Sequence, residues 1–275
     1  MQDKIVGVLG TGNMGESMIN GFLKSQIVSK ENILAFDFRE SRLYELQEEL
    51  GIHASNSNKE VVAESDLIFI AVKPQDLGEL LDEIVEVTLR DKIFISLAAG
   101  ISIDFIKQKL GYNTKIIRLM PNTPCLIGSG VIAMAEDGRN KSEDIKLVKS
   151  LLAPTAEVIE VKEELMNAVT GLSGNGPAYA FLMMEALANG GIKMGLAKDQ
   201  SITMAAQVMQ GAAKMVLETG KHPAELKEMV SSPGGTAIHS LQILEDNSVR
   251  GSLMRAVEAG ANRAKEISEA AGNKK

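Results

Sequence analysis

The chain has 275 residues, of which 45% are hydrophobic and 24% are charged. This length suits two domains, and the composition is that of a globular protein, which excludes a disordered or fibrous chain. The formal net charge of −7 argues against nucleic acid or an anionic membrane surface as the main partner.

The sequence carries no sign of export or of a membrane span. Residues 1–5 lack the basic segment and apolar core of a signal peptide. The longest apolar stretch, Leu67 to Val72, is far shorter than the roughly 20 residues that a membrane helix needs. The single cysteine, Cys125, excludes an intramolecular disulfide. We therefore expect a cytoplasmic protein with no membrane partner and no nucleic-acid partner.

The first half of the chain alternates short runs rich in aliphatic or aromatic residues with segments of helical spacing. The predicted strands are Ile5 to Leu9, Ile33 to Phe36, Leu67 to Val72, Ile93 to Leu97, Lys115 to Met120, Val131 to Ala135 and Glu157 to Val161. The predicted helices between them are Met14 to Leu23, Arg42 to Leu50 and Leu77 to Val87. Such βαβ units predict a mostly parallel sheet with helices on both faces, an α/β Rossmann domain over residues 1–162.

The second half, residues 163–275, contains no convincing strand and is rich in Ala, Met, Leu and Glu. It is predicted to be an all-α domain. The stretch Ala178 to Leu187 is apolar nearly all round, with Glu185 as its only charge. A helix of this kind is buried on several sides, and a domain of about 110 residues with so much apolar surface predicts obligate oligomerisation.

A glycine-rich turn follows the first predicted strand and opens the first helix. In that position glycines allow a tight turn and bring backbone amides at a helix N-terminus close to a pyrophosphate. The turn therefore predicts a dinucleotide site, whose cofactor-binding residues are Gly10, Thr11, Gly12, Asn13, Met14 and Gly15. The alternative is a purely structural turn.

Asp37 ends the second predicted strand, where an acidic residue commonly binds the ribose hydroxyls of NAD. This residue favours NADH. Arg39 and Arg42 stand close enough in sequence to bind the 2′-phosphate of NADPH instead, so both forms of NAD(P)H stay open. The alternative for both arginines is a solvated helix start.

Two further strand ends are candidates for the coenzyme site, because open α/β sheets bind ligands at the carboxyl ends of their strands. The first consists of Ala71, Val72, Lys73 and Pro74. The second is Leu97-Ala98-Ala99-Gly100, whose small residues either let a nicotinamide lie against the backbone or merely allow tight packing. The three histidines show no metal-ligand spacing, so we expect no metal.

A glycine-rich loop, Ser231 to Thr236, interrupts the helical half and precedes a new helix that starts near Thr236. Free amides at that start, together with the hydroxyls of Ser232 and Thr236, would form a carboxylate site. The alternative is a structural helix break. His239, one turn further on, either faces a pocket or is structural, and Cys125 is expected to be buried or to line a pocket.

Four motifs in this order resemble the pyrroline-5-carboxylate reductase family over nearly the whole chain, from Gly10 to about Arg263. The motifs are Ala71-Val72-Lys73-Pro74-Gln75, Met120-Pro121-Asn122-Thr123-Pro124, Leu172-Ser173-Gly174-Asn175-Gly176-Pro177-Ala178-Tyr179 and Val230-Ser231-Ser232-Pro233-Gly234-Gly235-Thr236. The resemblance implies an N-terminal Rossmann domain and a C-terminal helical domain that interlocks with a second subunit. It also implies dimers that can assemble into decamers, with active sites at the dimer interface.

The resemblance further implies reduction of the cyclic imine 1-pyrroline-5-carboxylate to L-proline by NAD(P)H. Asn58 and Lys73 would contact the cofactor, Ala98 would lie near it, and Glu163 would lie near the imine ring. The substrate carboxylate would be held by the loop that includes Ser232, Gly234, Gly235, Thr236 and Ala237, with Ser232 and Thr236 as the candidate catalytic hydroxyls.

The loop departs from the family pattern at one hydroxyl. Many relatives have a threonine immediately before the isoleucine, where this chain has Ala237 preceded by Thr236. Met229 stands where some relatives have a substrate-contacting asparagine. These changes leave open a paralogue that binds NAD(P)H without reducing an imine, or one with altered specificity. A β-hydroxyacid-dehydrogenase-like enzyme would need a catalytic lysine at the position of Ala180.

Overall fold

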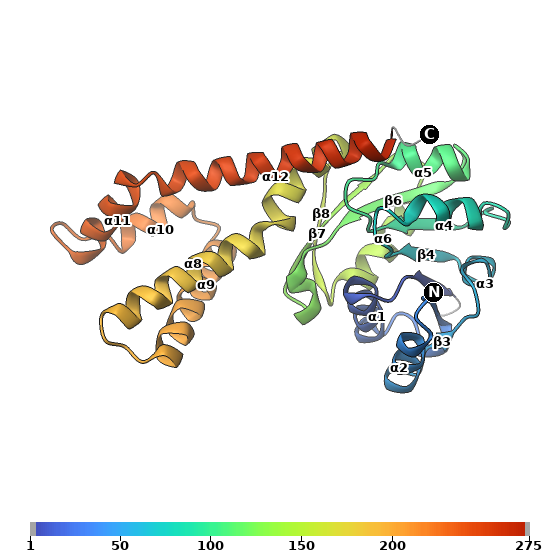
Figure 1. Ribbon diagram of the computed structural model, residues 1–275, viewed down its shortest axis with the longest axis horizontal. Coiled ribbons are helices and arrows are strands. Elements are labelled where there is room, and N and C mark those ends of the chain that lie inside the picture. Colours follow the sequence, from blue (N-terminus) through green and yellow to red (C-terminus); the bar gives the residue numbers. More distant parts are fainter. Residues whose placement is uncertain (1–3, 273–275) are drawn as a thin grey trace. The chain divides into compact units, whose positions relative to one another are not determined.

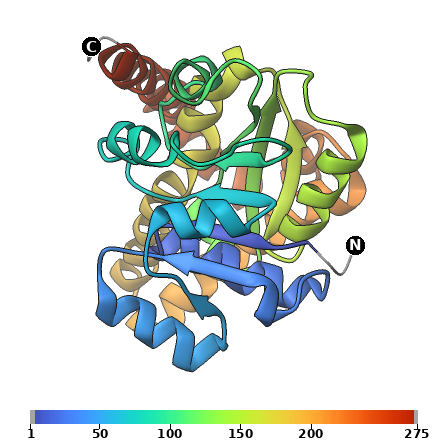
Figure 2. The ribbon, with the colours of Figure 1, turned by 90° about the vertical axis from the view of Figure 1, so that its right-hand side faces the viewer.

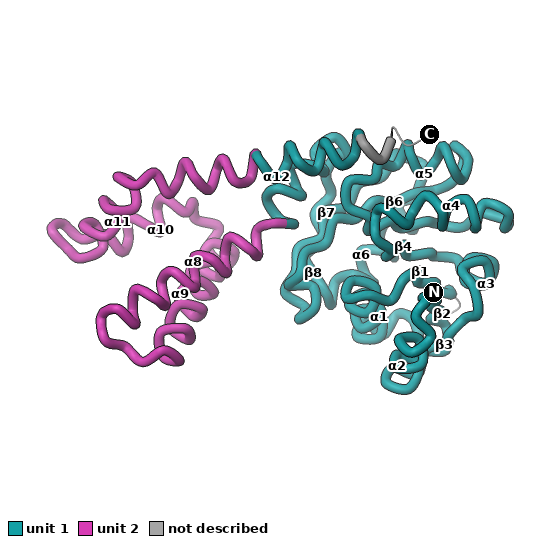
Figure 3. The backbone as a smooth tube through the Cα atoms, viewed as in Figure 1, with its two compact units in different colours: residues 1–174, 259–275 teal, residues 175–258 magenta. Residues whose placement is uncertain are grey.

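The computed structural model describes residues 4–272, and the chain divides into two compact units, residues 1–174 with 259–275 and residues 175–258 (Figure 3). The strands are β1 (Val6–Leu9), β2 (Ile33–Phe36), β3 (His53–Ala54), β4 (Leu67–Ile70), β5 (Ile93–Ser96), β6 (Lys115–Met120), β7 (Gly130–Glu136) and β8 (Ala156–Glu160). The helices are α1 (Asn13–Ser25), α2 (Glu40–Leu50), α3 (Asn58–Glu64), α4 (Leu77–Ile84), α5 (Ile103–Leu110), α6 (Ser142–Leu152), α7 (Met166–Val169), α8 (Gly176–Lys193), α9 (Lys198–Thr219), α10 (Pro223–Met229), α11 (Thr236–Asp246) and α12 (Val249–Gly272).

The first unit contains one eight-stranded sheet in the order β3-β2-β1-β4-β5-β6-β7-β8, with β6 and β7 antiparallel and the other pairs parallel. All seven predicted strands are present. The two-residue strand β3 was not predicted, and neither were the helices α3, α5 and α6. Helices lie on both faces of the sheet (Figures 1 and 2), which confirms the mostly parallel α/β architecture.

Two apolar clusters fill the two faces of this sheet. One packs α1, α2 and α6 against the sheet, and the other packs α3, α4 and α5 against it. Central strand β4, with the sequence LIFI, is buried along its whole length because parallel strands are covered on both sides. In α4 the buried residues Leu77, Leu80, Leu81 and Ile84 follow the i, i+3, i+4, i+7 spacing of one helix face.

The second unit is entirely helical and nearly lacks a core of its own. Of residues 175–258, all of which the structure describes, only Ala188, Ser201 and Ala205 are buried. The predicted apolar helix lies within α8, where Phe181 and Leu182 are 63% and 65% exposed. Burial on several sides is therefore not achieved within this single chain.

The domain boundary expected at residue 162 rests on the change from strand-forming runs to a helical composition, and it stays a prediction. The packing of the chain changes at other points, after Gly174 and after Glu258, and α12 runs through the second of these. Within residues 4–272, no helix combines the length and the apolar character that crossing a membrane would require.

Candidate active site

The parallel strands bring the predicted coenzyme residues of the first unit to one edge of the sheet. Backbone bonds link successive strand ends there: Gly10 N donates to Phe36 O over 2.9 Å, Ala71 N to Leu9 O over 2.8 Å and Leu97 N to Ile70 O over 3.0 Å. This is the carboxyl edge, where open α/β sheets bind their ligands.

The glycine-rich turn between β1 and α1 has the backbone that a dinucleotide site needs. Gly10 has a φ of 90°, a left-handed conformation that disfavours any side chain. A Cβ at Gly15 would collide with the carbonyl oxygen of Gly10, whereas a Cβ at Gly12 would meet no atom within 4 Å. Gly12 is the N-cap of the 13-residue α1 and has no side-chain cap. The open space at Gly12 and the uncapped helix start fit a pyrophosphate.

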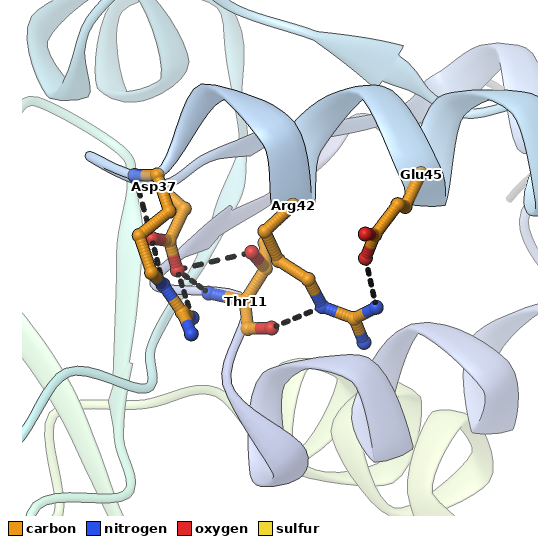
Figure 4. Close-up of polar contacts among 5 residues, drawn as sticks. Thr11, Asp37, Arg42 and Glu45 are labelled. Atoms are coloured by element: carbon orange, nitrogen blue, oxygen red, sulfur yellow. Dashed lines mark hydrogen bonds and ion pairs between the residues drawn. The ribbon is translucent and has the colours of Figure 1, made fainter.

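Asp37 lies just beyond β2 and turns its carboxylate towards the glycine-rich turn (Figure 4). Its Oδ2 accepts hydrogen bonds from Thr11 N at 2.8 Å and Thr11 Oγ1 at 3.0 Å. Arg39 donates to the same carboxylate through its backbone N, its Nε and its Nη2, at 3.0 to 3.1 Å. Burial by itself would raise the pKa of Asp37, but the hydrogen bonds from Arg39 and Thr11 outweigh it and hold the pKa well below its usual range.

The two arginines proposed for a phosphate have different surroundings. Arg42 is paired with Glu16. It is also paired with Glu45, and its Nε donates to the carbonyl oxygen of Thr11 at 3.5 Å (Figure 4). Its side chain is 23% exposed, against 61% for Arg39. Arg39 is therefore the more accessible of the two cations.

Other predicted coenzyme residues lie in or beside the same edge. Lys73 is exposed, and Ala98 is buried, with its backbone N donating to Ser96 Oγ at 3.3 Å. Asn58, the first residue of α3, is also buried, and its Nδ2 donates to Glu83 Oε2 at 2.8 Å. That bond joins α3 to α4, so the side-chain nitrogen of Asn58 already has a partner within the protein. A contact between Asn58 and the coenzyme stays a prediction.

Glu163 begins a short 3-10 turn after β8 and is held by two donors. Its Oε1 accepts from Ile103 N at 2.6 Å and from Arg118 Nη1 at 3.2 Å. Burial lowers the pKa of Arg118, and the hydrogen bond and negative charge of Glu163 offset part of this decrease. Arg118 was not among the predicted site residues, although a cation inside the apolar run of β6 is a signal for a buried ion pair.

The end of α12 contacts the loop after β5, which sequence patterns did not predict. Ser268 Oγ donates to the carbonyl oxygen of Gly100, and a Cβ at Gly100 would lie 3.0 Å from Ile267 Cγ2. The φ of Gly100 is 76°, so a glycine is required there for its backbone as well. Close packing, one of the two alternatives for residues 97–100, is thus present at Gly100, and a nicotinamide beside Ala98 stays a prediction.

In the second unit the glycine-rich loop ends at α11, which begins at Thr236 as predicted. Gly235 is its N-cap without a side-chain cap, and Gly234 has a φ of 66°. Gly235 N donates to Ser232 O at 3.0 Å, and Ser232 and Thr236 are both exposed. The loop therefore presents two hydroxyls beside an uncapped helix start, which is suitable for a carboxylate.

His239 and Cys125, the two other candidates from the sequence, both make contacts that support the local structure. Nδ1 of His239 lies 2.9 Å from the carbonyl oxygen of Gly235, so this ring braces the loop. Cys125 is buried, and burial raises the pKa of its thiol. A Cβ at Gly130 would collide with the sulfur of Cys125, so the thiol fills a tightly packed position.

The fold and the coenzyme cradle define an NAD(P)-dependent oxidoreductase with a Rossmann domain. A family model described as pyrroline-5-carboxylate reductase dimerisation matches residues 163–267, and one described as NADP oxidoreductase, coenzyme F420-dependent, matches residues 5–100. A pyrroline-5-carboxylate reductase of Methanosarcina acetivorans is 39% identical over 97% of this chain and 99% of its own length. The Escherichia coli protein of that name is 35% identical over 97% of this chain and 99% of its own length. The chain belongs to the pyrroline-5-carboxylate reductase family.

Solved structures of the family have the same fold. The Plasmodium falciparum pyrroline carboxylate reductase, solved with NADP bound, matches with a TM-score of 0.88 and 32% identity over 98% of this chain and 99% of that chain. The reductase from Coxiella burnetii matches with a TM-score of 0.90 and 30% identity over 96% of this chain and 98% of that chain. These matches confirm the family resemblance and the predicted combination of a Rossmann domain with a helical dimerisation domain.

Proposed function

We propose that this chain reduces 1-pyrroline-5-carboxylate to L-proline with NAD(P)H, the last step of proline biosynthesis. The observation that carries the proposal is the glycine cradle at the carboxyl edge of the sheet, in a chain that belongs to this family over its whole length. Gly10 and Gly15 allow the tight turn, and the open space at Gly12 would receive the pyrophosphate.

The protein's task in this reaction is to position two rings and to deliver one proton. The bound coenzyme supplies the hydride that adds to the imine carbon. The start of α1 would bind the pyrophosphate, and Ala71, Val72, Lys73, Pro74 and Ala98 at the carboxyl edge of the sheet would hold the rest of the coenzyme. The imine nitrogen takes up one proton to give the iminium form, and addition of the hydride to the imine carbon then neutralises that charge and leaves the ring amine of proline.

The substrate carboxylate is assigned to the loop of residues 232–237 in this proposal. Amides at the start of α11 and the hydroxyls of Ser232 and Thr236 would bind it, while a hydroxyl or a water that this loop holds would contact the imine nitrogen. Glu163 would act near the imine ring through its second oxygen, because Oε1 is occupied by Ile103 N and Arg118.

Self-association follows from the helical domain. We propose that this domain comprises residues 163–275. Three buried residues cannot stabilise the unit formed by residues 175–258, and its exposed apolar residues include Phe181, Leu182 and Leu217. A second copy of the chain would cover them, in agreement with the dimerisation model that matches residues 163–267. We propose a dimer that can assemble further into decamers, located in the cytoplasm.

The proposal is tested by following the absorbance of the reduced nicotinamide with purified protein and the imine, using NADH and NADPH separately. Imine-dependent loss of absorbance, with proline as the product, is the expected result. A protein that binds a coenzyme but never oxidises it in the presence of the imine would instead be a non-catalytic NAD(P)H-binding paralogue. The β-hydroxyacid-dehydrogenase alternative lacks its lysine, because that position is Ala180.

Thr236→Val should lower kcat about 10²-fold or more if the Thr236 hydroxyl replaces the one missing at Ala237, because proton delivery contributes on that scale. The matched control is Ala237→Thr in the same loop, which restores the hydroxyl at the usual family position. We expect the double variant to recover much of the lost kcat. An unchanged kcat in Thr236→Val would assign the proton to water or to the backbone.

A further inference from the structure

We propose that Arg39 makes this chain selective for NADPH, by closing Asp37 to the ribose hydroxyls of NADH and presenting a guanidinium to the 2′-phosphate. The inference deepens the proposed function, because it rests on the use of a nicotinamide coenzyme. It differs from the expectation drawn from Asp37 in the sequence, where an acidic residue at the end of the second strand favours NADH.

The carboxylate of Asp37 is already saturated by its own chain. It accepts five hydrogen bonds, two from Thr11 and three from Arg39, whereas a carboxylate offers about four lone-pair sites. Only 11% of the side chain is exposed. The two ribose hydroxyls of NADH both need acceptors, so they would have to displace Arg39 before binding Asp37.

Arg39, in contrast, is open on the side that does not face Asp37. It uses Nε and Nη2 for the pair, which leaves N–H groups of the guanidinium for another ligand, and 61% of its side chain is exposed. It is also the N-cap of the 11-residue α2, which has no side-chain cap. The guanidinium and the helix start favour the same ligand, an anion.

The charges of Asp37 and Arg39 also favour NADPH over NADH. Asp37 alone would repel a 2′-phosphate, but Arg39 neutralises it, and binding NADPH requires no rearrangement of the pair. Arg42 adds little, because Glu16 and Glu45 already hold its guanidinium. Since a preorganised group loses less on binding than one that must be displaced, the geometry favours the phosphate over the diol.

Calorimetric titration of the whole protein with NADPH, NADH, adenosine 2′,5′-bisphosphate and 5′-AMP tests the proposal without any chemical step. We expect NADPH to bind about tenfold or more tightly than NADH, and the bisphosphate to exceed 5′-AMP by a similar factor. The advantage should shrink as salt is raised, because Arg39 is exposed. Arg39→Ala should abolish the advantage and leave NADH binding unchanged or tighter, while Arg39→Lys should retain part of it.

The matched control is Arg90→Ala, which removes another exposed arginine, 87% exposed, from the loop before β5. It should leave the ratio of the two affinities unchanged. Equal or tighter binding of NADH by the unmodified protein overturns the proposal, and so does an equal loss of both coenzymes in Arg39→Ala. A selective protein that fails to reduce the imine would overturn only the proposed function, and a reductase with no selectivity would overturn only this inference.

Discussion

Gly12→Glu is expected to reduce coenzyme affinity at least about 100-fold, or ~2.7 kcal/mol, while the chain still folds. The space around Gly12 is open, so the new side chain meets no protein atom at its Cβ. Its carboxylate, however, would occupy the start of α1 and repel the pyrophosphate that we assign there. Titration with NADPH and NADH measures the loss, and the thermal midpoint reports whether the fold persists.

The control for this variant is Gly12→Ala. It changes the N-cap of α1 in the same way, which costs about 1 kcal/mol, but adds neither charge nor a long side chain. We expect both variants to share a small decrease in thermal midpoint, and only the glutamate variant to lose the coenzyme. Retention of wild-type affinity by Gly12→Glu would refute the assignment of the pyrophosphate to this turn.

Phe69→Ala is expected to destabilise the first unit by about 3–5 kcal/mol, the usual cost of emptying a buried aromatic position. Phe69 is 0% exposed in the middle of β4, and its ring lies 4.6 Å from that of Phe22, centroid to centroid. The cavity would open between the central strand and α1, where close packing limits collapse. Urea unfolding at fixed protein concentration measures the change.

Phe38→Ala makes the same substitution in the segment between β2 and α2, at a residue that is 81% exposed. Its ring contacts only that of Phe36 among the aromatic side chains of residues 4–269, with centroids 5.5 Å apart. We expect its effect to stay within about 0.5 kcal/mol. If the two variants shift the urea midpoint equally, the core assigned to this face of the sheet is wrong.

Several features of the candidate site were predictable because they depend on local patterns. The glycine-rich turn is defined by six consecutive residues, and the start of α11 at Thr236 follows from a glycine pair before a helical segment. The runs that form β1, β2, β4 and β5 are apolar almost throughout, which is the pattern of a sheet covered on both sides. Each of these signals lies within a few residues of the feature that it predicts.

Short elements escaped prediction for a physical reason. β3 is two residues long and exposed, so it lacks a periodic pattern, and its pairing with β2 alone defines it. The seven residues of α3 span about two turns, which is short for an apolar stripe, and in the eight residues of α5 the charged Lys107 interrupts the stripe of Ile103, Ile106 and Leu110. Their starts are marked by Ser57 and Ser102, whose side chains cap the helices and were the available signal.

The sequence by itself determined the α/β class, the glycine cradle and the helical second half, because periodicity and turn chemistry act between near neighbours. The tertiary structure decided which groups remain free to act. Thr11 reaches Asp37 across 26 residues, Arg118 reaches Glu163 across 45, and Ser268 reaches Gly100 across 168. No local pattern reports such contacts, because they form only when the sheet brings distant strand ends together. For that reason the sequence could place an aspartate at the coenzyme site, with Arg39 two residues further on, but could not show that Thr11 already bonds to its carboxylate.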